Sequence, residues 1–338
     1  MKKVFEEFHK LSGVLDISKH EQFIQGILNA IHNKSLVQGD KLPSVNEFMK
    51  ETNFARETIA KGYKELIRRG VVESKNRIGF FVANSNIQQE LKVALVLFAF
   101  DTFQETFYKT FRANVSDNVQ IDVFFHHNNI VIFENIIATI RGKYGMYVVA
   151  PIPHKKTAGI LLTLPRDKFL MIDRHEKLGT DFNFVTQEFK KSSYTAFAQL
   201  ADTIASFKMM HYYHRPQSDT PIEILSAFKK FVRDFRIRNE ICPEYIPGSI
   251  QKGHVYFTIN NTELWAMLKD CKVQHLVIGK DVGILSHNDD IVKEIICDGI
   301  TTYSTDFPLM AKKAAEFVIH REPIHETIPT VLIRRNSL

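Results

Sequence analysis

The chain has 338 residues, of which 44% are hydrophobic, and it carries a formal net charge of +6. This length exceeds that of an average single domain and predicts two domains with sizeable cores. Three distant cysteines, Cys242, Cys271 and Cys297, argue against a disulfide framework and show no metal-ligand spacing. The absence of an apolar run of about 18 residues and of an apolar N-terminal signal predicts a cytoplasmic protein without a membrane span.

The first residues of the chain lead into a small helical pattern. Residues 1–19 carry Phe5, Phe8 and Leu11 at helical spacing. Two interpretations are open: a short helix that packs on the next domain or on a partner, and a frayed tail. Residues 20–34 then have an apolar face and predict the first helix of a small domain.

Residues 39–82 have the order of a winged helix-turn-helix. Ser44 precedes a short helical pattern as its N-cap, with Glu47 at the capping-box position. A second helix is expected over residues 56–69, with one apolar face. Near its N-terminus, where a recognition helix contacts bases, the other face carries Arg56, Glu57, Thr58 and Lys61.

Two short predicted strands follow and flank a basic tip. This stretch resembles the DNA-binding domain of the GntR family of bacterial transcription regulators over roughly residues 20–84. The family's Gly-Asp-x-Leu-Pro-Ser pattern is intact at residues 39–44, and Arg56 and Thr58 match the start of its recognition helix. The wing keeps the last Gly of the family pattern, and the departures from that pattern are Asn46, Ala55 and Arg77.

The resemblance and the positions together predict the residues that contact DNA. They are Ser44, Arg56, Glu57, Thr58, Lys61, Lys75, Arg77 and Gly79. The alternative is a protein-interaction module in which Arg56, Lys61 and Lys75 are only solvated surface. A local excess of Lys and Arg over Glu between residues 56 and 77 favours DNA, which is a polyanion.

From residue 92 onward, short apolar runs alternate with helical patterns. This alternation predicts a doubly wound α/β domain, and its length of over 240 residues predicts two lobes with a cleft between them. Strands are expected at residues 93–98, 121–125, 146–150, 169–172, 209–212, 255–258 and 275–278. The predicted domains are residues 1–84, with residues 1–19 as an extension, and residues 92–338, joined by a polar linker over residues 85–91.

Residues 92–334 resemble the effector-binding domain of the LacI family, which has the fold of periplasmic sugar-binding proteins. The matching points are ordered along the chain: Asp101-Thr102-Phe103, Ile172-Asp173-Arg174, Asn260-Asn261, Ile278-Gly279-Lys280-Asp281 and Gly299-Ile300-Thr301-Thr302. Glu223 departs from the family, which often has a ligand-binding Arg there. The resemblance implies a C-terminal two-lobed α/β domain that binds a sugar or sugar derivative and dimerises.

Ligands of open α/β sheets bind beyond the carboxyl ends of the strands. Six candidate effector-binding residues are placed at such ends: Asp101, Phe103, Asp173, Arg174, Asn260 and Asp281. Carboxylate, amide and guanidinium groups pair with sugar hydroxyls, and an aromatic ring covers an apolar sugar face. Each has a structural alternative: a loop contact for Asp173 and Arg174, a core position for Phe103, a helix cap for Asn260 and a turn for Asp281.

Enzyme motifs are missing from the sequence. There is no Walker lysine loop, no GxGxxG after a strand and no GxSxG elbow. Adjacent His126 and His127 would point to opposite faces of a strand, and His211 and His214 lack a useful spacing, so neither catalysis, a metal nor a cofactor is expected. We expect a homodimeric repressor that binds operator DNA under ligand control; the alternative is a regulator whose α/β domain only dimerises.

Overall fold

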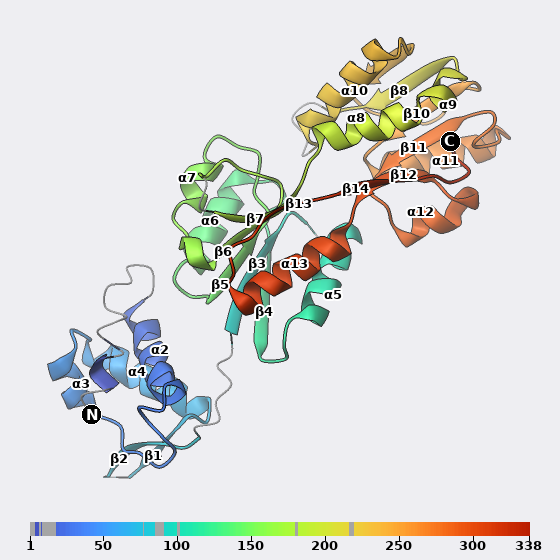
Figure 1. The fold of residues 1–338 in the computed structure, drawn as a ribbon. Coiled ribbons are helices and arrows are strands. Elements are labelled where there is room, and N and C mark those ends of the chain that lie inside the picture. The colour runs from blue at the N-terminus through green and yellow to red at the C-terminus, as the bar shows by residue number, and fades with distance from the viewer. Residues whose placement is uncertain are drawn as a thin grey trace.

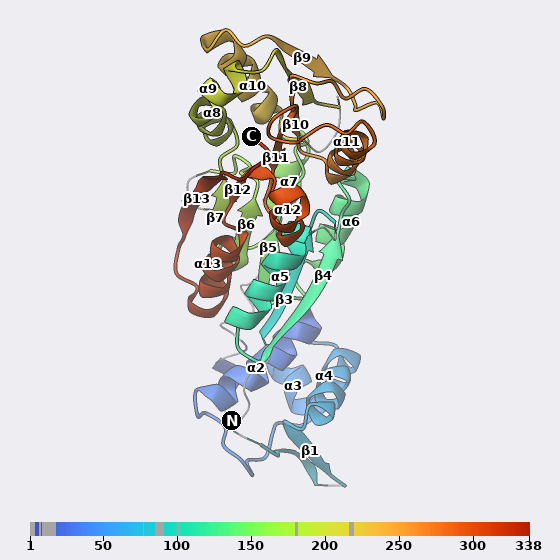
Figure 2. The ribbon, with the colours of Figure 1, turned by 90° about the vertical axis from the view of Figure 1, so that its right-hand side faces the viewer.

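The computed structural model of the chain describes residues 4–6, 8, 18–76, 78–84, 91–99, 102–179, 182–215 and 220–338. A small N-terminal domain precedes an α/β domain of two lobes (Figure 1). The turned view in Figure 2 shows the same order of the three parts along the molecule. Among the described residues, no helix is long and apolar enough to cross a membrane.

From residue 18 onward, the described part of the N-terminal domain has three helices and a two-stranded hairpin. Its elements are α2 (Lys19–His32), α3 (Val45–Glu51), α4 (Arg56–Arg68), β1 (Val72–Lys75) and β2 (Gly79–Val82). The two strands pair antiparallel, with Val72 opposite Val82. Phe23, Phe48 and Tyr63 are fully buried between the helices, and the ring of Phe80 in β2 stacks on Tyr63 with 3.9 Å between centroids. The winged arrangement predicted from the sequence is confirmed.

Part of the N-terminal extension packs on this domain. The rings of Phe5 and Phe8 are buried and lie 5.2 Å and 5.0 Å from the ring of Phe48. Gly26 of α2 makes the approach of Phe8 possible, because a Cβ at this position would lie 2.6 Å from the Phe8 ring. This contact agrees with the helix-packing interpretation for the described positions; Leu11 lies outside them.

Lobe 1 is a parallel sheet covered by helices on both faces. Its strand order is β13-β7-β6-β5-β3-β4. The strands are β3 (Leu91–Leu97), β4 (Val119–Phe125), β5 (Met146–Val149), β6 (Phe169–Asp173), β7 (Asn183–Gln187) and β13 (His325–Ile328). The helices are α5 (Thr102–Asn114), α6 (Ile130–Ile140), α7 (Thr157–Leu161) and α13 (Phe307–His320), with a 3-10 turn at Arg166–Lys168. Helices α5 and α13 cover one face, and α6 and α7 cover the other.

Lobe 2 repeats this plan with one antiparallel strand. Its strand order is β14-β12-β11-β10-β8-β9, in which only β14 runs against its neighbour. The strands are β8 (Met209–Tyr213), β9 (Asn239–Cys242), β10 (His254–Thr258), β11 (Gly283–His287), β12 (Thr301–Thr305) and β14 (Thr330–Ile333). The helices are α8 (Lys190–Gln199), α9 (Ala201–Ala205), α10 (Ile222–Asp234), α11 (Asn261–Val273) and α12 (Ile291–Ile295), with a 3-10 turn at Ile296–Asp298.

The chain passes between the lobes three times: after β7, after β12 and after β13. The predicted two-lobed α/β fold is therefore confirmed. Of the predicted linker at residues 85–91, only Leu91 lies within the described part of the chain, and it is the first residue of β3.

One predicted strand is wrong. Residues 275–278 form no strand apart from a single bridge between Ile278 and Val282, and the sheet strand is β11 (Gly283–His287). His275 has a φ of +57°, which interrupts an extended run, and the amide of Asp281 donates to the carbonyl of Val277 to close a turn. In β11, only Ile284 and Leu285 are consecutive apolar residues before the polar Ser286 and His287. The loop has a longer apolar run at residues 276–278, which is why it was predicted as the strand.

Candidate nucleic-acid interface and effector pocket

The first turn of α4 presents the residues expected to contact bases. Ala55 provides no side-chain cap, and Arg56 is exposed as the first helical residue. Arg56 forms none of the ion pairs found among the described residues. Glu57 and Lys61 pair with each other one turn apart at 2.9 Å on the exposed face, and Thr58 is half-buried. Arg56 is thus the cation of this turn whose charge is not already neutralised by a neighbour.

Ser44 has a clear structural role at the start of α3. Its Oγ accepts a hydrogen bond from the Glu47 amide at 3.3 Å, while the Glu47 carboxylate accepts from the Ser44 amide at 2.7 Å. These bonds hold the pKa of Glu47 below its usual range. The capping box predicted from the sequence is confirmed, and it satisfies backbone amides at the start of α3.

The wing carries a cation beside an aromatic ring. Lys75 Nζ lies 3.0 Å from the Glu73 carboxylate and 4.7 Å from the centre of the Phe81 ring. Gly79 opens β2 with a φ of +129°, a conformation that side chains rarely adopt. Arg77 lies outside the described residues. A phosphate that binds Lys75 must therefore compete with one half-exposed carboxylate.

A pocket of about 460 Å³ lies between the two lobes. It is lined by Phe98, Thr102, Phe103, Asp173, Arg174, Gln187, Phe189, Thr220, Pro221, Ile259, Asn260, Asn261, Thr262, His287, Asn288, Asp289, Asp290 and Lys293. These residues follow the carboxyl ends of strands in both sheets, where ligands of parallel sheets bind. The volume lies in the range of small-molecule sites.

Lobe 1 contributes a carboxyl group, a cation and an aromatic ring to the pocket. Asp173 ends β6 with a φ of +65°, and Gln187 Nε2 donates a hydrogen bond to its carboxylate. Burial raises the pKa of Asp173, although the Arg174 charge opposes the shift. The guanidinium of Arg174 lies 5.6 Å from the centre of the Phe189 ring. The ring of Phe103 packs on the ring of Phe307, the first residue of α13, with 4.9 Å between centroids.

Lobe 2 contributes buried polar atoms that have no partner. Asn260 caps α11, and its side-chain oxygen accepts from the Thr262 amide at 2.7 Å. Among the described residues, Asn261 Oδ1, His287 Nδ1 and Asn288 Oδ1 are buried without a hydrogen bond. Buried polar atoms in native proteins are nearly always paired with protein, water or ligand. Their gathering on one pocket wall indicates a place for a polar ligand.

His287 and Lys293 set the charge of this wall. Burial, together with the Lys293 and Arg174 charges, lowers the pKa of His287 to about 3, so its ring is neutral. Lys293 is only 1% exposed, and its Nζ donates to the carbonyls of His287 at 3.0 Å and Asn288 at 2.7 Å. The lysine thus fixes the segment that follows β11 and brings a positive charge to the pocket.

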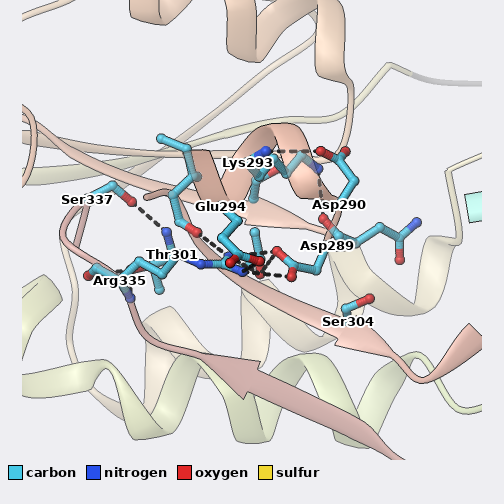
Figure 3. A network of polar contacts seen from close by, with 12 residues as sticks. Asp289, Asp290, Lys293, Glu294, Thr301, Ser304, Arg335 and Ser337 are labelled. Carbon is cyan, nitrogen blue, oxygen red and sulfur yellow. Dashed lines mark hydrogen bonds and ion pairs between the residues drawn. The ribbon is translucent and has the colours of Figure 1, made fainter. Parts of the chain in front are cut away.

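The carboxylate of Asp289 is bound by Arg335, which follows β14 (Figure 3). Arg335 binds its carboxylate with two nitrogens, at 2.7 Å and 2.8 Å, and Thr302 Oγ1 donates to it at 2.7 Å. Burial alone would raise the pKa of Asp289, but these bonds outweigh it and hold the pKa below its usual range. Ser337 accepts from the Thr301 amide at 2.7 Å and anchors the same segment. Asp289 is therefore an ionised, oriented carboxylate in the pocket wall.

The structure brings together four of the six residues predicted for the effector site: Phe103, Asp173, Arg174 and Asn260. Asp101 lies outside the described residues. The expected position of Asp281 is wrong, because this residue precedes β11 and lies away from the pocket. Its carboxylate pairs with Lys252 at 2.9 Å and accepts from the Val277 amide at 3.0 Å, as its turn alternative predicted.

Sequence reasoning missed His287, Asp289, Asp290 and Lys293. His287 ends β11, Asp289 and Asp290 follow it, and Lys293 lies in α12, so the error in placing that strand removed all four from the set of strand ends. The Asn288-Asp289-Asp290 run after a buried strand was the available signal.

Comparison with known proteins identifies the N-terminal domain. Residues 19–82 match the family described as "Bacterial regulatory proteins, gntR family". They form a GntR-type winged helix-turn-helix. A Bacillus subtilis protein described as "Uncharacterized HTH-type transcriptional regulator YhcF" is 39% identical over 72 residues, which are 21% of this chain and 60% of that protein. The chain thus matches less than two thirds of that relative's length.

Solved structures identify the fold of the rest of the chain. The trehalose repressor from Escherichia coli superimposes with a TM-score of 0.61 at 13% identity, over 72% of this chain and all of that one. A LacI family regulator from Lactobacillus casei with bound sucrose has a TM-score of 0.63 at 9% identity, over 73% of this chain and 99% of that one. A LacI family regulator from Enterococcus faecium with bound ribose gives 0.58 at 12% identity, over 73% and 98%. The C-terminal domain has the two-lobed LacI-type fold, and family and fold point to a transcription regulator and not to an enzyme.

Proposed function

We propose that the chain is a sequence-specific DNA-binding repressor whose affinity for its operator is set by a small ligand bound between the lobes. The observation that carries this proposal is the set of buried, unpartnered polar atoms on one pocket wall, contributed by Asn261, His287 and Asn288. A polar ligand in the pocket would supply the hydrogen-bond partners that these three atoms lack within the protein, and an unmade partner costs about 1–3 kcal/mol.

The chemistry of the pocket supports a sugar or sugar derivative as the ligand. Carboxylates, amides and two cations line it, and these groups pair with hydroxyls or with an anionic substituent. Phe98, Phe103 and Phe189 supply apolar surface that suits the face of a sugar ring. Proteins with this fold have been solved with sucrose and with ribose bound, which supports the same ligand class here.

The GntR-type domain supplies the DNA contacts in this proposal. Arg56 is the base-reading cation at the start of α4, with Glu57, Thr58 and Lys61 beside it. Ser44 supports the approach of α3 to the backbone, and the wing, through Lys75, Arg77 and Gly79, binds phosphate or the minor groove. We place the protein in the cytoplasm as a homodimer joined through the α/β domain, which predicts an operator with inverted repeats.

Ligand control follows from unequal binding to two lobe arrangements. A ligand changes DNA affinity only if it binds one arrangement better than the other, and typical coupling is about 1–3 kcal/mol. We expect the ligand to favour a rotation of the lobes that changes the spacing of the two DNA-binding domains. The half-sites then no longer match, and the operator is released.

A thermal-shift screen tests the pocket. Monosaccharides, disaccharides and sugar phosphates are added to the full chain, and a ligand at about 100 times its Kd adds roughly 2.7 kcal/mol of stability. Asp289→Asn should weaken the hit about tenfold or more, because the ligand loses a charged acceptor. Asp281→Asn is the matched control and should keep the response. Equal weakening by both variants would contradict the site, and failure of the whole panel would favour a domain that only dimerises.

A further inference from the structure

Four side chains of the kind that bind transition metals meet on lobe 2, away from the effector pocket. His211 lies on β8, Glu240 and Cys242 lie on β9, and His254 lies on β10. The register places His211 beside Glu240, and alternation along each strand turns all four side chains to the sheet face that α11 covers. None of the four lines the effector pocket. The labels β8 and β9 in Figure 2 mark the edge of the sheet where the cluster lies.

The geometry of three of these side chains fits one ion. The ligand atoms of His211, Glu240 and Cys242 all lie within 4.8 Å of one another. His211 Nδ1 and the Glu240 carboxylate are 3.3 Å apart. Two ligands of one tetrahedral Zn²⁺ are about 3.3–3.8 Å apart, because each bond is about 2.0–2.3 Å long. A small movement of side chains would bring all three atoms to bonding distance.

The fourth side chain orients the first. His211 Nε2 lies 2.8 Å from His254 Nδ1, and the two rings are stacked with 5.0 Å between centroids. The Tyr256 ring stacks on His211 from β10 at 4.9 Å. A histidine that binds a metal through Nδ1 carries its proton on Nε2 and donates it to an acceptor, which here is His254. The buried His211 ring therefore already has the partner that a metal-bound imidazole requires.

The cluster has a route to solvent. Strand β9 is the edge strand of the sheet, and the Glu240 side chain is 59% exposed. Cys242 is half-buried beside it. An ion can thus enter past Glu240 and reach the thiol and the imidazole, which lie deeper.

We propose that His211, Glu240 and Cys242 form a binding site for Zn²⁺ or a similar divalent transition metal, with His254 as the positioning residue of His211. One nitrogen, one carboxylate oxygen and one thiolate are ligands that Zn²⁺ accepts, and a water completes four-coordination. On binding, the Cys242 thiol loses its proton to solvent and the sulfur coordinates as thiolate. The three ligands join the neighbouring strands β8 and β9, and His254 adds a contact from β10, so occupancy stabilises the edge of lobe 2.

Binding of Zn²⁺ and Co²⁺ alone to the full chain tests this site. We expect one equivalent of either ion to bind, to raise Tm, and, for Co²⁺, to produce the absorption band of a cobalt–thiolate bond. Cys242→Ser should abolish that band, while Cys297→Ser, a control at an exposed cysteine outside the cluster, should keep it. His254→Ala should keep the band and weaken affinity about 10–100-fold, as for the loss of an orienting partner.

If neither ion binds at micromolar concentration, a proton alone bridges His211 and Glu240 and the proposal is overturned. Binding that lacks a thiolate band, or that survives both Cys242→Ser and Glu240→Gln, would put the ion elsewhere and also overturn it. None of these results depends on the sugar ligand or the operator.

Discussion

The side-chain carbonyl of Gln187 accepts a hydrogen bond from Thr305 Oγ1, with 2.7 Å between the oxygens. These two residues end β7 and β12, at two of the three crossings between the lobes. At the third crossing, the hydroxyl oxygen of Thr330 lies 3.2 Å from the hydroxyl oxygen of Thr305. Gln187 also donates to Asp173 in the pocket wall. A single, partly buried network therefore links a ligand-site carboxyl to all three segments about which the lobes can rotate.

Gln187→Met tests this network. The substitution keeps a similar volume but leaves Asp173 and Thr305 without their shared partner, so the free energy of unfolding should fall by about 1–3 kcal/mol. Denaturant unfolding of the full chain measures the change. Gln199→Met, at an exposed position of α8, is the control and should be nearly neutral. Equal unfolding free energies for the two variants would show that the network contributes nothing to stability.

Arg56→Ala should remove specific operator binding and leave the fold intact. A bidentate contact between Arg and guanine is worth about 1–3 kcal/mol of discrimination, and Arg56 has no intramolecular ion pair to satisfy among the described residues. Operator affinity and base preference are measured by selection and titration. Arg68→Ala, at the other end of α4, provides the control, since Arg68 already pairs with Glu65. The docking of α4 would be wrong if Arg56→Ala kept both affinity and base preference.

Replacing Lys75 and Arg77 together with Ala should weaken binding to all DNA sequences to a similar degree. If both residues contact phosphate, the slope of log K against log salt should become shallower by about 2. Lys252→Ala, in lobe 2, is the control for a general loss of positive charge. An unchanged slope in the double variant would exclude phosphate contacts by the wing.

Acid should destabilise the protein through two buried histidines. The Asn128 amide donates to His126 Nδ1 at 3.1 Å, and Nε2 lies 3.1 Å from the Ala150 carbonyl, which suits a neutral ring. Burial lowers the pKa of His126 to about 4 and, with nearby charges, that of His287 to about 3. The unfolded chain binds these protons at its ordinary pKa of about 6.5, so their stabilising contribution is present above that pH and is lost as the pH falls toward the folded values.

Urea unfolding between about pH 7 and pH 4 measures this loss. Each neutral histidine contributes up to about 1.4 kcal/mol per pH unit to the slope. His126→Gln should therefore flatten the dependence of unfolding free energy on pH. The same slope in the variant and the parent chain would contradict a neutral, buried His126.

Local signals predicted the GntR-type domain well. The capping box of Ser44 and Glu47, the helix start at Arg56 and the wing glycine Gly79 each fix geometry within a few residues. In the α/β domain, apolar runs predicted most central strands for the same reason, because a buried parallel strand is a short continuous apolar run.

The remaining features depend on contacts between distant residues. The pairing of Asp289 with Arg335 spans 46 positions, and that of His211 with His254 spans 43. Spacing along the chain gives no sign of either pair, because the sheet register brings them together. The apolar loop at residues 275–278 resembled a strand, and this shifted the expected carboxylate from Asp289 to Asp281.

We propose that a ligand in the pocket and the operator on α4 influence each other's binding. The most direct test is the Kd of the full chain for its operator with and without a saturating ligand that raises Tm in the screen. We predict a change of about 5- to 150-fold, and an equal change in ligand affinity when operator is present, as linkage requires. An operator Kd that is the same with and without a ligand proven to bind would show that the pocket and α4 are not coupled.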